Sequence, residues 1–350
     1  MTLDATQAAR VEALAREVRT GRRAALARAI TLVESTRAAD RPAADALLGA
    51  LTAGAGAQTS HRVGITGVPG AGKSAFIEAM GTRLTGQGHR VAVLAVDPSS
   101  VRSGGSILGD KTRMARLSRD PNAFIRPSPS AGALGGVARR TRETILVCEA
   151  AGFDVVLVET VGVGQSEVMV AEMVDFVLVL VLAGGGDELQ GMKRGIFELA
   201  DLIAVTKADG NNVAAAERAR QELKAALHYL RPRADGWQPR ALTCSSFEGT
   251  GLDEIWAAVL AHRRLLEVHG SFVAHRQAQN LRWMWAAVER GLLAALEADP
   301  VVRAALGRLE SDVRRGTIAP DRAAAELLQA FGVGRRDETP SDDSGASNPR

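Results

Sequence analysis

The sequence predicts an α/β fold: a mostly parallel sheet covered by helices on both faces, with helical segments before and after it. Between residues 59 and 269, short apolar runs alternate with amphipathic stretches of helical length, which is the pattern of strand–helix–strand crossover units. Two of these runs, 155–158 and 177–182, are continuously apolar, as expected for parallel strands that are buried on both faces. We therefore expect one sheet domain over residues 59–269.

An N-terminal helical extension is predicted over residues 1–58. Leu26, Ile30 and Val33 recur at the spacing of one helix face, and alanine and arginine fill many of the other positions. A second helix is expected over residues 42–51, before a glycine-rich segment.

Seven apolar runs are the predicted strands of the sheet domain. Helix-length segments separate most of them, so the strands are expected to run parallel. The runs are residues 62–67, 90–97, 123–127, 154–160, 175–182, 201–207 and 240–245.

A C-terminal helical arm is predicted over residues 270–334. Pro300 and Gly316 mark the boundaries of two further helices in it. An arm of this length buries little hydrophobic core by itself. We therefore expect it to pack either on the sheet domain or on a second copy of the chain, and we favour the second copy, as a dimerisation arm. The polar tail, 335–350, is expected to be disordered. Five apolar residues of the arm form one stripe at helical spacing: Leu281, Met284, Trp285, Val288 and Leu292.

Composition argues against several classes of function. The 350 residues include 43 Lys and Arg against 40 Asp and Glu, without a basic run that contains aromatics, so nucleic acid is not an expected partner. The longest apolar run, which begins at Phe176, is too short to span a bilayer, and no apolar signal core opens the chain. We expect no membrane association and a cytoplasmic location, with Cys148 and Cys244 as buried, reduced thiols.

A glycine-rich loop follows the first predicted strand. Its sequence, GVPGAGKS, fits G-x-x-x-x-G-K-[ST], lies directly after a strand and opens a helix, as a phosphate-binding loop requires. Glycines let successive backbone N–H groups surround a phosphate, and the helix N-terminus adds its positive dipole end. Lys73 is expected to neutralise the β- and γ-phosphates, and the Ser74 hydroxyl to ligate Mg²⁺. The residues predicted to hold a nucleoside triphosphate here are Gly67, Val68, Pro69, Gly70, Ala71, Gly72, Lys73, Ser74 and Ala75.

The segment TKADG, which starts at Thr206, predicts that the base is guanine. Asp209 can accept hydrogen bonds from both guanine N1–H and the exocyclic amine, while the stem of Lys207 covers the ring. Adenine presents the wrong donor pattern, and a buried polar site can reject such an analogue by up to roughly 10⁴–10⁵. Thr206 stands where GTPases usually carry Asn, and we expect this to cost about one hydrogen bond, on the order of 1 kcal/mol.

A second segment on the base side is TCSSFEGTGL, from Thr243. It follows the last predicted strand, where the final base-binding loop of a GTPase is expected. Ser245, Ser246 and Phe247 are predicted to contact the guanine through backbone and side chain.

Carboxylates at strand ends are the predicted partners of Mg²⁺, which prefers oxygen ligands. Asp97 ends the second predicted strand, and Glu159 ends the fourth in an E-T-x-G turn suited to sensing the γ-phosphate. Asp110 lies in a glycine- and serine-rich segment suited to switching. The predicted metal site is therefore Ser74, Asp97, Asp110 and Glu159.

One more loop, 183–195, has the sequence AGGGDELQGMKRG and leaves the carboxyl end of a strand. Ligands of open α/β sheets bind at that edge. A charged, glycine-rich loop there can respond to the phosphates and to a partner together.

Taken together, these segments resemble the MeaB/ArgK family of SIMIBI-class P-loop GTPases, which includes the human protein deficient in methylmalonic aciduria type A. The resemblance covers residues 10–333. It implies an Mg²⁺-dependent GTPase that converts GTP and water to GDP and phosphate. The segments that carry it are GVPGAGKS, DPSS…GGSILGDKTRM, VETVGVGQSE, GGGDELQGMKRG and TKADG.

The resemblance also implies a partner. It suggests a chaperone of an adenosylcobalamin-dependent acyl-CoA mutase, chiefly methylmalonyl-CoA mutase, that gates cofactor loading and protects or reactivates the mutase. It implies a homodimer joined through C-terminal helices. In the family, the stretch over 184–195 is an additional switch that couples the mutase to the nucleotide, and Asp187 and Lys193 occupy the positions implicated in that coupling.

The expected catalytic residues are Lys73, Glu159, Asp187 and Lys193. Water attacks the γ-phosphate in line while Lys73, Mg²⁺ and Lys193 stabilise the developing charge. No obvious glutamine aligns the water, although Gln165 and Glu159 are candidates, so intrinsic hydrolysis is expected to be slow. A partner that supplies charge could accelerate it by as much as ~10³–10⁵.

Three other functions compete with this one. A kinase of the ArgK transport type needs an acceptor pocket and a base, and the sequence shows no signature for either. A metal-insertion GTPase of the same class needs a Cys/His delivery motif, which is also missing from the sequence. In a binding module without hydrolysis, GTP would only order a scaffold, and Asp97 and Glu159 argue against this reading.

Overall fold

The computed structural model describes residues 3–53, 60–96, 114–127, 134–160, 166–183, 194–229 and 235–333. They divide into two compact units, Met1–Arg276 and Gln277–Arg350, which are described in turn. The first holds the sheet, and the second holds the last helices.

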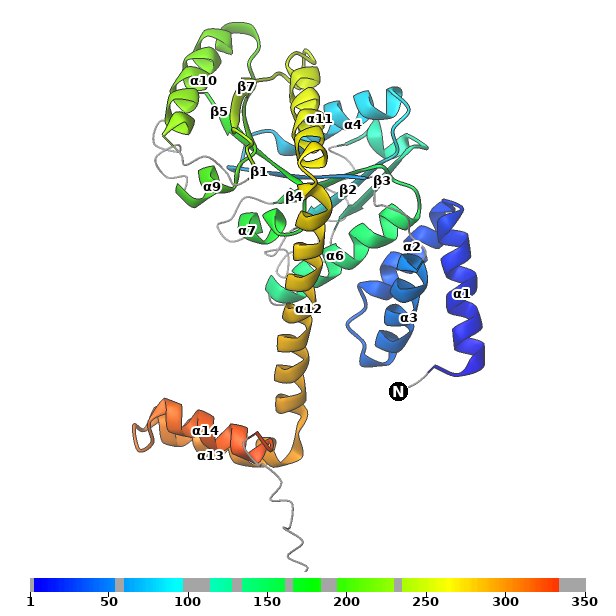
Figure 1. Ribbon diagram of the computed structural model, residues 1–350, viewed down its shortest axis with the longest axis vertical. Coiled ribbons are helices and arrows are strands. Elements are labelled where there is room, and N and C mark those ends of the chain that lie inside the picture. Colours follow the sequence, from blue (N-terminus) through cyan, green and yellow to red (C-terminus); the bar gives the residue numbers. More distant parts are fainter. Residues whose placement is uncertain are drawn as a thin grey trace, which may run out of the picture. The chain divides into compact units, whose positions relative to one another are not determined.

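One seven-stranded sheet forms the centre of the first unit (Figure 1). All adjacent strands run parallel, in the order β3-β2-β4-β1-β5-β6-β7. The seven predicted strands and the α/β fold class are thereby confirmed. The strands are β1 (His61–Gly67), β2 (Val91–Val96), β3 (Ala123–Pro127), β4 (Val155–Thr160), β5 (Phe176–Leu182), β6 (Leu202–Thr206) and β7 (Arg240–Thr243).

The strand order reverses around β1, which lies between β4 and β5. Ile65 of β1 is in register with Glu159 of β4, and Gly67 of β1 with Leu180 of β5. Because all strands are parallel, their carboxyl ends meet at one edge, and a ligand crevice is expected at this switch point. The sheet therefore brings the carboxyl ends of β1, β4 and β6 to one edge.

Helices α4 (Lys73–Gly86) and α11 (Leu252–Val268) cover one face of the sheet. Side chains at every second strand position, such as Val63 and Ile65 of β1, pack there against Phe76 of α4 and Ile255 of α11. Alternate residues of a strand point to opposite faces, so the remaining positions face the other layer.

Helices α6 (Leu134–Ala150) and α7 (Ser166–Ala171) contact the strands β1, β2 and β4 (Figure 1). Gly64 of β1 shows how closely α7 approaches, since a Cβ there would lie 2.7 Å from Cγ1 of Val170. Beyond this layer, α9 (Arg194–Leu199) precedes β6, and α10 (Val213–His228) packs against β6 and β7.

Three N-terminal helices pack against one another and against α6. Asp4 accepts a hydrogen bond from the backbone N–H of Gln7, and the Gln7 side chain accepts one from Asp4 N, so the chain begins its first helix with a capping box. The helices are α1 (Ala5–Arg19), α2 (Arg23–Val33) and α3 (Arg41–Thr52), with a short 3-10 turn, η1 (Ala38–Asp40), before α3.

The first unit ends inside α12 (Ser271–Ala298), whose first turns are tied to the sheet. Arg276 Nη2 donates to Asp175 Oδ2 at 2.6 Å, Nε donates to Oδ1 at 2.9 Å, and Nη2 also donates to the carbonyl oxygen of Ser60 at 2.7 Å. Asp175 directly precedes β5 and accepts a further bond from the backbone N–H of Arg62 at 3.1 Å. The start of α12 is thus fixed by buried charged groups.

The second unit contains the rest of α12, α13 (Pro300–Arg314) and α14 (Pro320–Ala330). Asp299 caps α13 by accepting from the N–H groups of Val301 and Val302 at 2.8 and 3.0 Å, and Pro300 follows it at the first helical position. None of the helices in the described part of the chain combines the length and the apolar character needed to cross a bilayer.

Candidate functional site

The glycine-rich loop connects β1 to α4 at the carboxyl edge of the sheet. Gly67 has φ 145°, and a Cβ on it would lie 2.1 Å from the carbonyl oxygen of Leu180, so only glycine fits there. Gly70 and Gly72 have left-handed φ values of 82° and 83°. These backbone conformations turn the chain back directly onto the N-terminus of α4, where N–H groups favour an anion.

Lys73 is the first residue of α4 and is largely buried, with 8% of its surface exposed. Its ammonium donates to the carbonyl oxygens of Gly67 at 2.8 Å and Val68 at 3.1 Å. The positive charge therefore lies within the loop itself. A phosphate oxygen attracts the ammonium more strongly than these carbonyls do, because it carries a negative charge and they are neutral.

The next residue, Ser74, meets an acid from a neighbouring strand. Its Oγ donates to Glu159 Oε1 at 3.0 Å, and Glu159 ends β4 with 8% of its surface exposed. Beside them, Thr160 Oγ1 donates to Thr66 Oγ1 at 2.9 Å, which ties the ends of β4 and β1 together. A hydroxyl from the first turn of α4 and a carboxylate from the end of β4 are oxygen donors of the kind that Mg²⁺ prefers. This donor set fits a magnesium ion.

Five predicted residues lie outside the described residues: Asp97, Asp110, Gln165, Asp187 and Lys193. Of the predicted metal ligands, the structure brings together Ser74 and Glu159. Of the predicted catalytic residues, it describes Lys73 and Glu159.

Thr206 joins the base side of the site to the phosphate loop. Its buried hydroxyl lies 2.8 Å from the carbonyl oxygen of Ala71 and 3.1 Å from that of Val181, and one hydroxyl hydrogen serves these two acceptors. The substitution of Asn by Thr therefore keeps a hydrogen bond to the loop. An asparagine amide would bring a second donor hydrogen, which a threonine lacks.

Lys207 follows with φ 55°, a left-handed conformation that is uncommon outside glycine. Its carbonyl oxygen accepts a hydrogen bond from the side-chain amide of Asn212 at 2.7 Å. The Asn212 backbone N–H donates in turn to the carbonyl oxygen of Asp209 at 2.9 Å. Asn212 thus supports the turn that holds Lys207 and Asp209. Sequence reasoning missed it, although the pair Asn211-Asn212 is a common turn signal.

Asp209 and Ser245 connect the loops after β6 and β7. The Ser245 hydroxyl, which is fully buried, donates to Asp209 Oδ2 and accepts from the backbone N–H groups of Phe247 at 3.2 Å and Glu248 at 3.0 Å. Within the described residues, Asp209 Oδ1 receives no hydrogen bond. One carboxylate oxygen is therefore held in place while the other is open to a donor such as a base edge.

The remaining predicted base contacts differ in exposure. Phe247 is 93% exposed and Ser246 is half-buried.

The neighbouring residue Cys244 is buried, and burial raises the pKa of its thiol to about 12. Its backbone carbonyl accepts from Ala208 N at 3.1 Å. Cys244 is therefore a structural thiol of the base-side loops, and the second cysteine, Cys148, is also buried.

Comparison with known proteins agrees with this geometry. The model of a family described as methylmalonyl Co-A mutase-associated GTPase MeaB matches residues 26–301. A protein named putative GTPase from Caulobacter vibrioides is 55% identical over 323 residues, 92% of this chain and 98% of the relative. The mitochondrial methylmalonic aciduria type A homolog of Mus musculus is 48% identical over 319 residues, 89% of this chain and 77% of the relative. A crystal structure titled LAO/AO transport system kinase superposes with TM-score 0.73 and 39% identity, covering 95% of this chain and all of that one.

Proposed function

Because this chain belongs to the MeaB family of methylmalonyl-CoA mutase-associated GTPases, we propose that it is a GTP-hydrolysing chaperone of an adenosylcobalamin-dependent acyl-CoA mutase. In this role it would gate cofactor loading and protect or reactivate the mutase. The observation that carries the hydrolytic part of the proposal is the hydrogen bond of 3.0 Å from Ser74 Oγ to Glu159 Oε1, next to Lys73 of the phosphate loop. The mutase part rests on the family description.

The proposed reaction starts with GTP seated on Gly67–Ala75. Lys73 exchanges its two loop carbonyls for oxygens of the β- and γ-phosphates. Asp209 accepts from the guanine edge through its open Oδ1, while Ser245 keeps Oδ2 in place. Water then attacks the γ-phosphorus, the bond to the β-phosphate oxygen breaks, and GDP and phosphate remain.

The metal in this proposal is Mg²⁺. Ser74 and Glu159 would hold it, with Asp97 and Asp110 as the further proposed ligands. When bound, it supplies positive charge next to the phosphate oxygens. Asp187 and Lys193 remain the proposed link between the nucleotide and the mutase.

A homodimer through the helical arm is also part of the proposal. All five residues of the predicted apolar stripe are exposed in the single chain, from 40% at Val288 to 60% at Trp285. An exposed apolar surface of this kind marks an interaction site. A second copy of the arm would bury it.

The test is phosphate release from GTP and from ATP, with and without a cobalamin-dependent acyl-CoA mutase from the same source. We expect slow hydrolysis of GTP, acceleration by the mutase and no turnover of ATP. GTP hydrolysis that no mutase changes would remove the assigned partner and leave the GTPase. Equal turnover of ATP would contradict the role of Asp209.

The main rival is a kinase, because the solved relative at 39% identity is titled a transport system kinase. The same assay separates the two functions. A kinase passes the γ-phosphate to a protein or small-molecule acceptor, so radiolabel from the γ-position would stay on that acceptor. A GTPase releases all of it as inorganic phosphate.

A further inference from the structure

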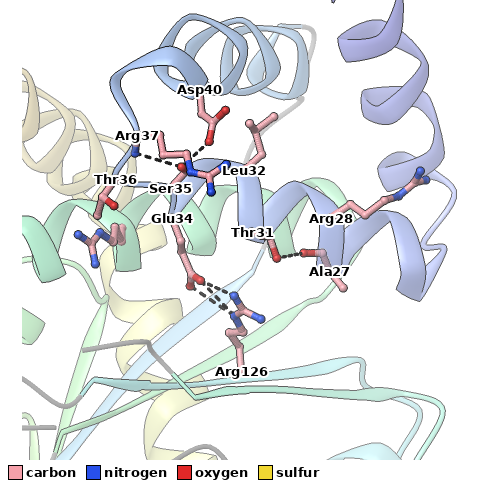
Figure 2. A pocket seen from close by; sticks show the side chains of 11 residues that line it. Ala27, Arg28, Thr31, Leu32, Glu34, Ser35, Thr36, Arg37, Asp40 and Arg126 are labelled. Carbon is pink, nitrogen blue, oxygen red and sulfur yellow. Dashed lines mark hydrogen bonds and ion pairs between the residues drawn. The ribbon is translucent and has the colours of Figure 1, made fainter. Parts of the chain in front are cut away.

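A cavity on the first unit lies away from the glycine-rich loop (Figure 2). It is open to solvent on one side and has a volume of about 800 Å³, within the range of small-molecule sites in proteins. Helix α2, the segment that leads to α3, the end of β3 and helix α6 supply its lining. The lining residues are Ala27, Arg28, Thr31, Leu32, Glu34, Ser35, Thr36, Arg37, Asp40, Arg126 and Arg140.

Four guanidinium groups line this cavity, and two of them are already paired. Arg126 Nε donates to Glu34 Oε2 at 3.2 Å, as Figure 2 shows, and Arg28 Nη2 donates to Glu17 Oε2 at 2.6 Å. The only other acid of the lining, Asp40, accepts from the hydroxyl of Ser35. Arg37 and Arg140 are left, and neither has an ion pair or a side-chain hydrogen bond within the described residues.

Arg140 is the unusual member, because it is 94% buried, with 6% of its surface exposed. Its Nε is shielded from solvent and has no hydrogen-bond partner among the residues that the structure describes. The acid one turn further along α6, Glu143, pairs with Arg41 at 2.9 Å instead. A buried charge without a partner is strongly unfavourable in a folded protein, and arginine is almost never fully buried unless it is paired. The cavity therefore has an unsatisfied cation in its wall.

We propose that this cavity binds an organic phosphate monoester, whose phosphate takes Arg140 and Arg37 as its counter-ions. A dianion matches the two unpaired guanidinium groups, and the planar fork of each arginine fits two phosphate oxygens. The hydroxyl of Thr36 lines the same space and can donate to the anion, whereas the hydroxyl of Thr31 already donates to the carbonyl oxygen of Ala27 at 2.9 Å. The apolar side chains of Ala27 and Leu32 give the organic part of the ligand a surface to cover.

This site is separate from the nucleotide site but lies on the same edge of the sheet. Arg126 and Pro127 end β3 and are in register with Leu94 and Ala95 of β2, and Ala95 is in register with Glu159 of β4. The proposal does not depend on the proposed function, since it uses none of the residues of the glycine-rich loop.

The experiment measures binding of inorganic phosphate by calorimetry to the full chain saturated with Mg²⁺ and a non-hydrolysable GTP analogue. The analogue occupies the γ-phosphate position, so phosphate cannot bind there. We expect saturable binding that is at least ~10-fold weaker in Arg140→Gln, because a charged hydrogen-bond donor is lost. The matched control is Arg139→Gln, which removes the same charge one position away on α6, from a residue that does not line the cavity.

Two further measurements distinguish a loss of phosphate binding from a folding defect of the variant. Arg37→Gln changes an exposed residue and is also expected to weaken binding. Without ligand, Arg140→Gln should unfold at the same temperature as the unchanged protein or at a higher one, because it removes an unpaired buried charge. Absence of saturable phosphate binding, equal binding by Arg140→Gln, or equally tight binding of acetate would each overturn the proposal.

Discussion

The hydroxyl of Thr206 lies 2.8 Å from the carbonyl oxygen of Ala71, so the strand that leads to the base-binding segment is bonded directly to the phosphate loop. The two residues are far apart in the sequence and belong to the segments that we propose to hold opposite ends of one nucleotide. Loss of this bond should therefore affect the affinity for the nucleotide as a whole.

Replacement of Thr206 by Val keeps the shape of the side chain and removes the hydroxyl. We expect GTP and GDP to bind about 5-fold more weakly, the equivalent of roughly 1 kcal/mol for one hydrogen bond, with the preference for guanine unchanged. Titration calorimetry with GDP, GTP and ATP measures this. Thr206→Asn should restore the affinity, and unchanged binding by Thr206→Val would show that the bond has no role in nucleotide affinity.

Replacement of Asp209 by Asn should change the base preference. An amide offers one acceptor and two donor hydrogens, so it suits xanthine, whose C2 carries an oxygen in place of the amino group of guanine. We expect GTP affinity to fall by ~10² or more and XTP to bind better than GTP. Glu248→Gln, an exposed acid of the neighbouring loop, is the control and should keep the preference for GTP.

Replacement of Glu159 by Gln keeps an acceptor for the Ser74 hydroxyl and removes the negative charge. We expect the Mg²⁺ concentration for half-maximal hydrolysis to rise, or turnover to fall, by about 10–100-fold. Single-turnover hydrolysis of GTP across a magnesium titration measures both. The exposed Glu222 of α10, changed to Gln, should behave as the unchanged protein.

Asp175 should contribute to stability through its charge. Burial raises the pKa of its carboxyl, but hydrogen bonds from Arg276 and the charges of Arg276 and Arg62 outweigh this and hold the pKa below its ordinary value. The unfolded chain therefore takes up the proton at higher pH than the folded one, so this stability is complete above the ordinary carboxyl pKa of ~4 and is lost as the pH falls below it.

Asp175→Asn leaves Arg276 without its carboxylate and should lower the free energy of unfolding by about 3–5 kcal/mol at neutral pH. The difference between the variant and the unchanged protein should shrink as urea unfolding is repeated at lower pH. Asp45→Asn removes an exposed acid of α3 and should change little. A difference that stays constant down to pH ~3 would contradict the ionic origin of this effect.

Trp285→Ser tests the apolar stripe of α12. Trp285 is 60% exposed, so the change should leave the folded chain intact and weaken association between two copies. Light scattering after size exclusion should give the mass of two chains for the unchanged protein and of one chain for the variant. Arg282→Ser, an exposed residue of the same helix, should remain dimeric, and a monomeric unchanged protein would remove the dimer from the proposal.

The sequence alone could predict the sheet, because each of the seven strands is a short apolar run. It could also predict the residues of the phosphate loop, because Gly67, Gly70 and Gly72 carry backbone conformations that only glycine adopts readily. These features depend on neighbours along the chain.

What the sequence could not predict depends on distant partners. The pairing of Asp209 with Ser245 and of Thr206 with Ala71 follows from the strand order, which no local pattern specifies. Arg140 is one of many arginines in an arginine-rich sequence, and only the structure shows that it is buried and that no described residue pairs with it.

The contacts of Arg276 determine where the chain can be shortened without loss of the fold. A shortened chain that stops at His269, where the sequence pattern changes, would keep all seven strands but lose Arg276. Asp175 would then be a buried acid without its main counter-ion, and the carbonyl of Ser60 would lose a donor. A chain that stops about one helical turn after Arg276 would keep both contacts. We expect this truncated form, and not the one that stops at His269, to fold and bind nucleotide without the arm.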